Sequence, residues 1–209
     1  AKRVLRAAPF KVTGVDFAGP LYCKDFPGKK FYFLLFTCGV VRAVHLELTS
    51  SLSEQDAYHA FRRFAARRGN PSDVISDNAK TFVRLAKSLV RDLGPNAPKW
   101  KFNAPRAPWW GGFWERLVRS VKTHIKKCTG TKSLTKGELE TLLCEIERCV
   151  NSRPLTFVGD LPDAITPLTP AHFLMGRTMN EQSESSTSVD RSDLVTLKEE
   201  LDERLEGFW

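Results

Sequence analysis

The sequence predicts an α/β fold in which a mixed β-sheet carries helices on both faces. Three observations predict it. Strand-like segments come first with short connections, amphipathic helices then alternate with further strands, and no internal repeat is present. Connections this short exclude parallel crossovers, so the first strands are expected to be antiparallel.

Three strands are expected within the first 50 residues. Residues 10–18 are mostly apolar and end at Gly19-Pro20, which is expected to stop the strand. Residues 29–38 contain FYFLLF, a run typical of a strand buried on both faces. Residues 41–48 (VRAVHLEL) alternate, and they are expected to pair with the second strand through a turn at Gly39.

Helices are expected wherever apolar residues recur at helical spacing. The expected helices cover residues 53–68, 79–92, 112–128, 135–151 and 170–175. Ser53 is a capping residue for the first, and Thr135 with Glu138 forms a capping box for the fourth. Short strands at 73–76 and 99–103 complete the outline of an RNase H-like domain with a C-terminal helical extension.

Charge is unevenly distributed along the 209 residues. The formal net charge is +8, but residues 177–209 hold four basic and nine acidic side chains. The rest of the chain is therefore strongly basic, which favours a polyanion such as nucleic acid as its partner. No apolar run is long enough to span a bilayer, so no membrane association is expected. The five cysteines form no CxxC pair and are expected to be free thiols.

Three acidic residues occur where an acid is unusual. Asp16 lies within an apolar strand, where a carboxylate is costly unless it is paired or bound to a cation. Asp77 follows a short strand, and strand ends are where α/β folds place ligand sites. Glu115 opens a helix after a Gly-rich loop. Three converging carboxylates without His or Cys suit two Mg²⁺ or Mn²⁺ ions, the arrangement used in phosphoryl transfer.

Two of these acids also have an ordinary structural explanation, and Asp16 is the least easily dismissed of the three. Asp77 before Asn78 fits a helix cap or an Asx-turn. Glu115 fits a first-turn acid that complements the helix dipole. The catalytic interpretation therefore rests on the order and combination of the three acids and not on any one of them.

The helix after Glu115 adds an independent argument. Arg119, Lys122 and Lys126 follow it at spacings that place all four residues on one helical face. A basic solvent-exposed face or a plain Glu115–Arg119 pair would have the same spacing. We favour contact with a phosphate backbone, because the candidate metal ligand leads directly into the cations.

Several blocks of the sequence resemble the D,D,E core of retroviral and retrotransposon integrases. The blocks are VDFAGP (15–20), SDNAKTF (76–82) and PWWGGFWERLVRSVK (108–122), with LTKGELETLLCEIERCVNSRPL (134–155) and ITPLTPAHFLMGR (165–177) further on. They are most similar to the BEL/Pao class of long-terminal-repeat retrotransposons. The resemblance implies an integrase catalytic core over residues 1–177, followed by a Ser-rich linker (178–189) and an amphipathic helical tail (190–209).

The resemblance also implies a chemistry and its residues. Asp16, Asp77 and Glu115 would bind two Mg²⁺ or Mn²⁺ ions, for 3′-end processing of element DNA and strand transfer into target DNA. It further implies DNA contacts, which we assign to Arg119, Lys122, Lys126, Asn78, Trp109 and Trp110. Packing is an equal alternative for the two tryptophans. The gap between Asp77 and Glu115 is slightly long for the family, and Ala79 replaces a common Gly, but no ligand is lost.

Three functions are compatible with these features. The first is an active, nuclear integrase core that binds double-stranded element and target DNA as a homo-oligomer, at least a dimer. The second is a domesticated descendant that binds DNA or protein without transposition. The third is an RNase H-fold nuclease, which the downstream blocks disfavour. The zinc-binding and basic flanking domains of integrases do not fall within these residues, and DNA-end synapsis is expected to need them.

Overall fold

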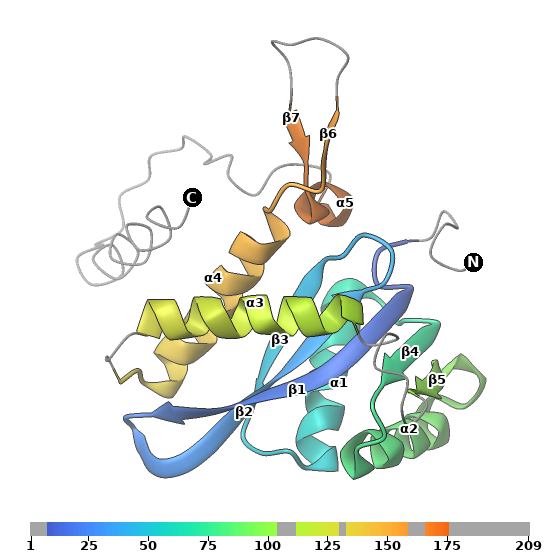
Figure 1. Cartoon of the computed structure of the whole chain (residues 1–209). Coiled ribbons are helices and arrows are strands. Elements are labelled where there is room, and N and C mark those ends of the chain that lie inside the picture. The colour runs from blue at the N-terminus through green and yellow to red at the C-terminus, as the bar shows by residue number, and fades with distance from the viewer. Residues whose placement is uncertain (1–7, 104–111, 130–132, 159–165, 176–209) are drawn as a thin grey trace, which may run out of the picture.

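The structure is a computed structural model, and it describes residues 8–103, 112–129, 133–158 and 166–175 (Figure 1). Within these ranges, the side chains of residues 112–115, 129, 156–158 and 166 are not described. The expected Ser-rich linker (178–189) and helical tail (190–209) lie outside the described residues.

A five-stranded mixed sheet forms the centre of the domain. Its strands are β1 (Val12–Cys23), β2 (Phe26–Cys38), β3 (Val44–Thr49), β4 (Asp73–Ser76) and β5 (Lys99–Phe102). Their order is β3-β2-β1-β4-β5. The first three strands are antiparallel, whereas β4 and β5 run parallel to β1. This confirms the predicted mixed sheet.

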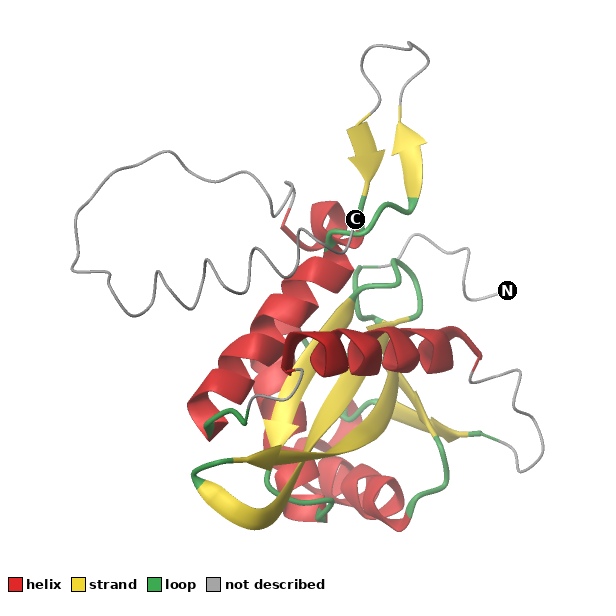
Figure 2. Ribbon diagram, turned by 60° about the vertical axis from the view of Figure 1, so that its left-hand side comes forward, coloured by secondary structure: helices red, strands yellow, loops and turns green. Residues whose placement is uncertain are grey.

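Helices cover both faces of this sheet (Figures 1 and 2). Those following β3 are α1 (Glu54–Arg68), α2 (Lys80–Leu93), the 3-10 turn η1 (Gly94–Asn96), α3 (Gly112–Thr129), α4 (Lys136–Asn151) and α5 (Pro170–Met175). Helices α1 and α2 pack on one face, and α3 lies across the other with α4 beside it. The predicted capping box of Thr135 and Glu138 is present at the start of α4.

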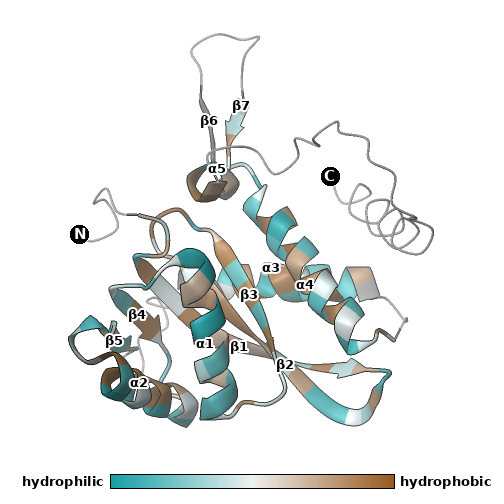
Figure 3. Ribbon diagram, turned by 180° about the vertical axis from the view of Figure 1, so that it is seen from behind, coloured by the Kyte–Doolittle hydropathy of each residue, from teal (hydrophilic) through white to brown (hydrophobic). Residues whose placement is uncertain are grey.

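Two hydrophobic clusters, one on each face, hold these layers together. Along β2, Phe33 and Leu35 pack in the cluster under α3 and α4, whereas Leu34 and Phe36 pack in the cluster under α1 and α2. All four side chains are fully buried. The apolar run FYFLLF is therefore the central partition between two cores, as its composition predicts. Figure 3 shows the apolar strands behind the polar outer surfaces of α1 and α2.

The β1–β2 hairpin is longer than expected. Gly19-Pro20 was predicted to end the first strand, but β1 continues to Cys23 and pairs with β2 as far as Phe26. The pairing register shifts between Ala18 and Leu21, so Pro20 lies at an irregularity where no ladder hydrogen bond from its nitrogen is needed. The prediction was wrong because a bulge accommodates the proline.

A second small hairpin was also missed. Strands β6 (Thr156–Val158) and β7 (Thr166–Leu168) pair as an antiparallel ribbon next to α5. The sequence after Pro154 was expected to be loop-like. Three-residue strands are too short to show a two-residue periodicity, so the sequence offered no signal for them.

The edge strand β3 is covered by side chains of α4. Asn151 accepts from the Val44 N–H at 2.8 Å and donates to the Val44 carbonyl at 2.9 Å. Glu147 accepts from the Leu46 N–H at 2.8 Å. Backbone groups that would otherwise face an open edge are thus satisfied by a helix rather than by another strand.

Two further expectations concern the thiols and the membrane. All five cysteines are free, three of them buried. Across the described part of the chain, no helix is both long and apolar enough to cross a membrane.

Candidate active site

The parallel pairing of β1 and β4 brings two of the predicted acids level with one another. These strands are parallel neighbours, with Val12 opposite Asp73 and Gly14 opposite Ile75. Continued by two residues, the same register places Asp16 opposite Asp77. Adjacent strands lie about 4.8 Å apart, so the two backbones are close at this point. Two acids that are 61 positions apart in sequence are therefore carried by neighbouring parts of the sheet.

Asp16 belongs to the face of the sheet that α3 covers. Its neighbour Val15 packs in the cluster under α1 and α2, so alternation directs Asp16 to the opposite side. There it lines a hollow of about 390 Å³ together with Val118, Arg119, Lys122, Thr123 and Lys126 of α3. Asp16 is only partly exposed. A carboxylate in a central strand is thus placed among cations at the rim of a cavity.

Asp77 is exposed just beyond the end of β4. Its Oδ1 accepts a hydrogen bond from the Ala79 N–H at 3.0 Å, which is the Asx-turn expected as the ordinary explanation. That bond uses one of two carboxylate oxygens. The turn therefore fixes the orientation of the carboxylate at the start of α2 and is compatible with metal binding by the second oxygen.

A set of hydrogen bonds that the sequence analysis missed holds the end of β4. Asn78 donates from Nδ2 to the Asn103 carbonyl at 2.6 Å, and the Asn103 N–H donates to the Ser76 carbonyl at 2.9 Å. The Trp100 indole N–H donates to Ser76 Oγ at 2.9 Å. Asn78 was predicted to contact DNA, and the structure gives its amide this bond within the protein. No local pattern pairs Asn78 with Asn103, because the contact depends on the β4–β5 register.

The cations of α3 share one face, as their spacing predicts. Arg119, Lys122 and Lys126 all line the hollow that contains Asp16. Arg119, Lys122 and Lys126 are exposed, whereas Val121 and Ile125 on the other side of the helix are buried in the core. The three cations therefore form an exposed row along the face of α3 that borders Asp16.

The third expected ligand is only partly described. Glu115 lies in the first turn of α3, one turn before Arg119, but its side chain is outside the described set. Trp109 and Trp110 lie outside the described residues altogether. Among the side chains that are described, no three His, Cys, Asp or Glu residues lie close enough together to hold a metal ion.

The donors present at the strand ends nevertheless fit a hard divalent cation. Asp16 and Asp77 offer carboxylate oxygens on adjacent strands. The described lining of the hollow contains neither His nor Cys. Oxygen-only ligands of this kind select Mg²⁺ or Mn²⁺ over zinc or copper.

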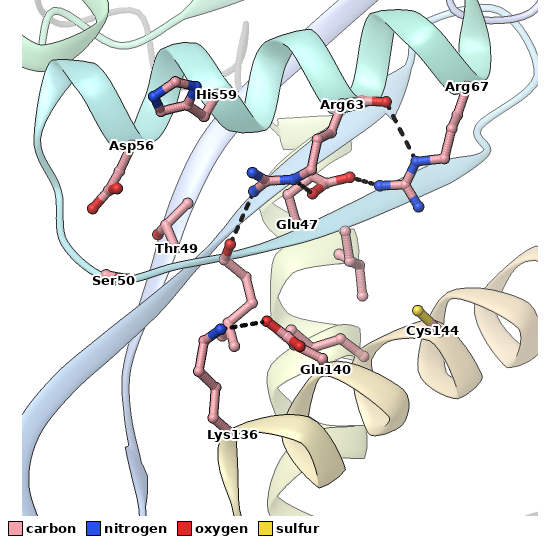
Figure 4. Close-up of a pocket in the computed structure, with 13 residues that line it drawn as sticks. Glu47, Thr49, Ser50, Asp56, His59, Arg63, Arg67, Lys136, Glu140 and Cys144 are labelled. Atoms are coloured by element: carbon pink, nitrogen blue, oxygen red, sulfur yellow. Dashed lines mark hydrogen bonds and ion pairs between the residues drawn. The ribbon is translucent and has the colours of Figure 1, made fainter. Parts of the chain in front are cut away.

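A second, larger cavity of about 470 Å³ lies between α1, β3 and α4 (Figure 4). Its arginines and its lysine are already paired with glutamates of the same lining. Arg63 and Arg67 both bind Glu47, and Lys136 binds Glu140 at 3.0 Å. No predicted site residue lines it. Size alone would favour this cavity, but its satisfied ion pairs make it a structural feature rather than the candidate active site.

Beneath that cavity, β3 carries a buried polar pair that sequence reasoning also missed. His45 Nε2 and Glu47 Oε1 are 2.8 Å apart, and Arg68 Nε donates to His45 Nδ1 at 3.3 Å. An imidazole that accepts at Nδ1 and donates at Nε2 is neutral. Burial lowers the pKa of His45 and outweighs the opposing effect of Glu147, and Arg67 and Arg68 lower it further. The alternation of VRAVHLEL gave no sign that its polar face is buried.

Comparison with known proteins supports the fold. No protein-family model matches this sequence, and no curated protein matches it. Solved structures do match. A chain of the simian T-cell lymphotropic virus intasome in complex with PP2A regulatory subunit B56 gamma aligns with a TM-score of 0.61 at 14% identity. That alignment covers 87% of this chain and 61% of the intasome chain, so the present chain spans less than two thirds of it.

Two structures of the HTLV-2 integrase catalytic core domain in complex with magnesium also match. The dimeric form has a TM-score of 0.58 at 14% identity, with 80% of this chain and 97% of that chain covered. The trimeric form has a TM-score of 0.53 at 14% identity, with 73% and 91% covered. At such identity the likeness establishes the fold alone. The domain has the RNase H-like fold found in retroviral integrase catalytic cores.

Proposed function

We propose that this chain is the catalytic core of a DNA integrase from a retroelement, most similar to the BEL/Pao class. The observation that carries the proposal is the position of Asp16. The register of the parallel strands β1 and β4, continued by two residues, puts it level with Asp77, and it lines one hollow with Arg119, Lys122 and Lys126. Carboxylates at a sheet edge beside a cationic helix face suit the cleavage and joining of a phosphate backbone.

The carboxylates would act as metal ligands. Asp16 within β1 and Asp77 just after β4 would supply two ligands, and Glu115, in the first turn of α3 and one turn before Arg119, would supply the third. Two bound Mg²⁺ or Mn²⁺ ions would activate the attacking oxygen and stabilise the leaving oxygen. The Asx-turn at Ala79 fixes Asp77 before any ion binds, which lowers the cost of ordering that ligand.

The α3 cations would bind the DNA backbone beside these ligands. Arg119 lies one turn beyond position 115, and Lys122 and Lys126 continue the row along the helix. Each neutralised phosphate releases counterions and fixes the DNA relative to the carboxylates. The row therefore aligns the scissile phosphodiester, while the carboxylates supply the site of reaction.

Two successive reactions would follow at this site. In 3′-end processing, water attacks phosphorus, a P–O3′ bond breaks, and a free 3′-hydroxyl remains on the element DNA. In strand transfer, that 3′-hydroxyl attacks a phosphodiester of target DNA, a new P–O bond forms, and the target 3′-oxygen leaves. Both are in-line displacements, so one arrangement of ligands serves both. A substrate of chromosomal DNA would place the protein in the nucleus.

The comparisons support this proposal through the fold and through what the matched structures contain. The HTLV-2 integrase cores are described in complex with magnesium. The same cores were solved in dimeric and trimeric forms. We extend both properties to this chain as part of the proposal.

The test is a strand-cleavage and joining assay with Mg²⁺ or Mn²⁺, using Asp77→Asn and Glu115→Gln. We expect each variant to lose about 100-fold or more of the activity, since even groups that only support metal ligands cost 10- to 100-fold. Asp73→Asn is the matched control. Asp73 begins the strand that leads to Asp77 but is engaged by Lys101 at 2.9 Å, so its loss should leave cleavage largely intact.

A binding measurement makes the outcome decisive for an isolated core. Mn²⁺ should raise the thermal unfolding temperature of the wild type and of Asp73→Asn but not of Asp16→Asn or Asp77→Asn. Absence of both cleavage and metal stabilisation in the wild type would contradict the catalytic proposal. Retained DNA binding in that case would indicate the domesticated, non-catalytic alternative.

A further inference from the structure

The tip of the β1–β2 hairpin is a polar ribbon that projects from the domain. It extends past the helices at the lower left of Figure 1. Residues Tyr22 and Lys24 to Lys30 are all exposed, and the rings of Tyr22 and Phe26 are 57% and 41% exposed. Single exposed apolar residues need no explanation, but two exposed rings on one tip with three lysines form a distinct surface.

The ribbon is anchored to the domain rather than loosely attached. The Lys24 N–H donates to the Leu134 carbonyl at 2.8 Å. Lys24 Nζ lies 3.3 Å from Glu138, and the Lys136 N–H at the start of α4 donates to both oxygens of Asp25, at 3.0 and 3.1 Å. These contacts hold the ribbon in position. They also engage Asp25, the one acidic residue between Leu21 and Phe31.

The remaining charge of the ribbon is positive and is carried on both faces. Lys30 lies directly across from Tyr22, on one face of the hairpin. Lys29 belongs to the other face, where its Nζ lies 5.4 Å from the ring centroid of Phe26 and 5.1 Å from that of Phe31. The two rings hold the ammonium in place by cation–π attraction. Each face therefore presents one lysine next to one exposed aromatic ring.

We propose that this ribbon is a second DNA-binding element that enters the major groove of the duplex held along α3. A major groove about 12 Å wide admits a two-stranded β-ribbon. Inside the groove, Lys29 and Lys30 on opposite faces reach the phosphates of the two walls. Tyr22 and Phe26 meet base edges, including the methyl groups of thymine. This inference rests on the proposed function, because it presupposes duplex DNA at the α3 cations.

The distance between the two elements fits one continuous duplex. Tyr22 lies six positions beyond Asp16 along β1, which at about 3.3 Å per residue is about 20 Å. That span corresponds to about six base pairs at 3.4 Å each. The chain leaving α3 also returns to the ribbon, since Leu134 accepts from Lys24. DNA that follows the row from Arg119 to Lys126 is therefore directed toward the hairpin.

Charge favours nucleic acid over a protein partner. Lysine is depleted from the buried centres of protein interfaces and is typical of surfaces that bind phosphates. The ribbon is anchored, carries exposed lysines, and has Asp25 already bonded to the start of α4. It therefore resembles a surface that binds phosphates.

The test measures affinity for a 16-base-pair duplex as a function of salt, with the full chain. We expect Lys29→Ala/Lys30→Ala to lower the affinity about tenfold at low salt and to reduce the slope of log K against log[salt] by about 1.8, or 0.9 per lost phosphate contact. The charge-matched control is Arg62→Ala/Lys87→Ala, which removes two exposed cations from α1 and α2 on the other face of the sheet. The control should change the slope little.

A third variant separates this inference from the proposed function. Arg119→Ala/Lys122→Ala should reduce both affinity and slope if α3 binds DNA. Loss in that variant, with the ribbon variant indistinguishable from the control, would overturn the ribbon proposal and leave the proposed function standing. If the wild type shows no salt-dependent duplex binding, both fail together. Equal unfolding temperatures of all variants ensure that the differences report binding.

Discussion

At the level of single residues, buried polar and charged side chains are grouped around His45. The imidazole contacts Glu47 of its own strand, Arg68 of α1 and Glu147 of α4. Burial raises the pKa of Glu147, but the Leu46 N–H and Arg68, which both donate to this carboxylate, lower it, and it lies below its ordinary value. The Glu147 carboxylate is thus charged and the imidazole neutral in the folded protein, and breaking one partnership would leave another group buried without compensation.

This arrangement predicts that acid begins to destabilise the protein at a higher pH than the titration of carboxylates alone would. Because the pKa of His45 is lowered from 6.5 on folding, the unfolded chain binds a proton that the folded chain does not in the range just below pH 6.5. The free energy of unfolding should therefore fall as the pH drops below 6.5, with a slope approaching about 1.4 kcal/mol per pH unit. Urea denaturation at a series of pH values measures this slope.

Two histidine variants identify the source of that slope. His45→Gln should flatten the stability profile between pH 6.5 and 5, whereas His59→Gln on the exposed face of α1 should leave it unchanged. An unaltered profile in His45→Gln would show that His45 is not the titrating group.

Asp77 illustrates what residue-level reasoning can and cannot decide from sequence. Two explanations were open, a turn residue and a metal ligand. The turn bond to Ala79 is present, and it occupies a single oxygen. The sequence could not reveal that the two explanations are compatible, because that depends on which oxygen the turn uses. It also could not place Asp16 beside Asp77, since no periodicity records which strands are neighbours.

At the level of elements, α4 joins the hydrophobic cluster beneath α3 to the edge strand β3. Its apolar face packs in the cluster beneath α3, and its polar residues Glu147 and Asn151 bind the backbone of β3. Its start is fixed by a complete capping box and by Asp25 of the hairpin. A change at this N-terminus should therefore affect the stability of the whole domain.

We predict that Thr135→Ala lowers the free energy of unfolding by about 1 kcal/mol, the usual cost of losing an N-cap side chain. Thr141→Ala is the matched control in the same helix, because the Thr141 hydroxyl is exposed and only bonds back to Gly137 at 3.0 Å. The control should change stability by less than about 0.5 kcal/mol. The midpoint of urea denaturation at constant m-value measures both. Equal effects would argue against the cap.

Prediction of elements succeeded where periodicity was long and failed where it was interrupted. The helices beginning after Ser53 and Thr135 were correctly placed, because a cap and four turns of apolar spacing agree. The first strand was wrongly ended at Gly19-Pro20, because sequence does not show whether a proline meets a ladder position or a bulge. Because the strand was ended at that residue pair, the expected β1–β2 hairpin was too short. The DNA-ribbon proposal depends on its full length.

At the level of the whole molecule, the fold class followed from the order of elements. Short connections between the first strands and alternation afterwards were enough for a mixed sheet with helices on both faces. The arrangement of the strands, with β1 in the middle and β4 beside it, was not predictable from local signals. The candidate site arises from that arrangement, because it joins β1, β4 and α3.

We predict that the chain associates at least into dimers at high concentration. An integrase must act on two DNA ends, and the HTLV-2 core was solved in dimeric and trimeric forms. Sedimentation velocity over a hundredfold range of concentration should show a sedimentation coefficient that rises above that of a 23.6 kDa monomer. A strictly monomeric profile at the highest concentration would contradict the prediction.

The contacts of Asn151 and Glu147 with β3 have a consequence for solubility. An uncovered outer strand exposes a row of amide groups that can recruit the same strand from another molecule and start fibrous growth. Here the amides of Val44 and Leu46 are occupied by side chains, and the opposite outer strand is only four residues long and carries two lysines. The sheet is thus protected from lateral extension on one side by a helix and on the other by the shortness of a lysine-bearing strand.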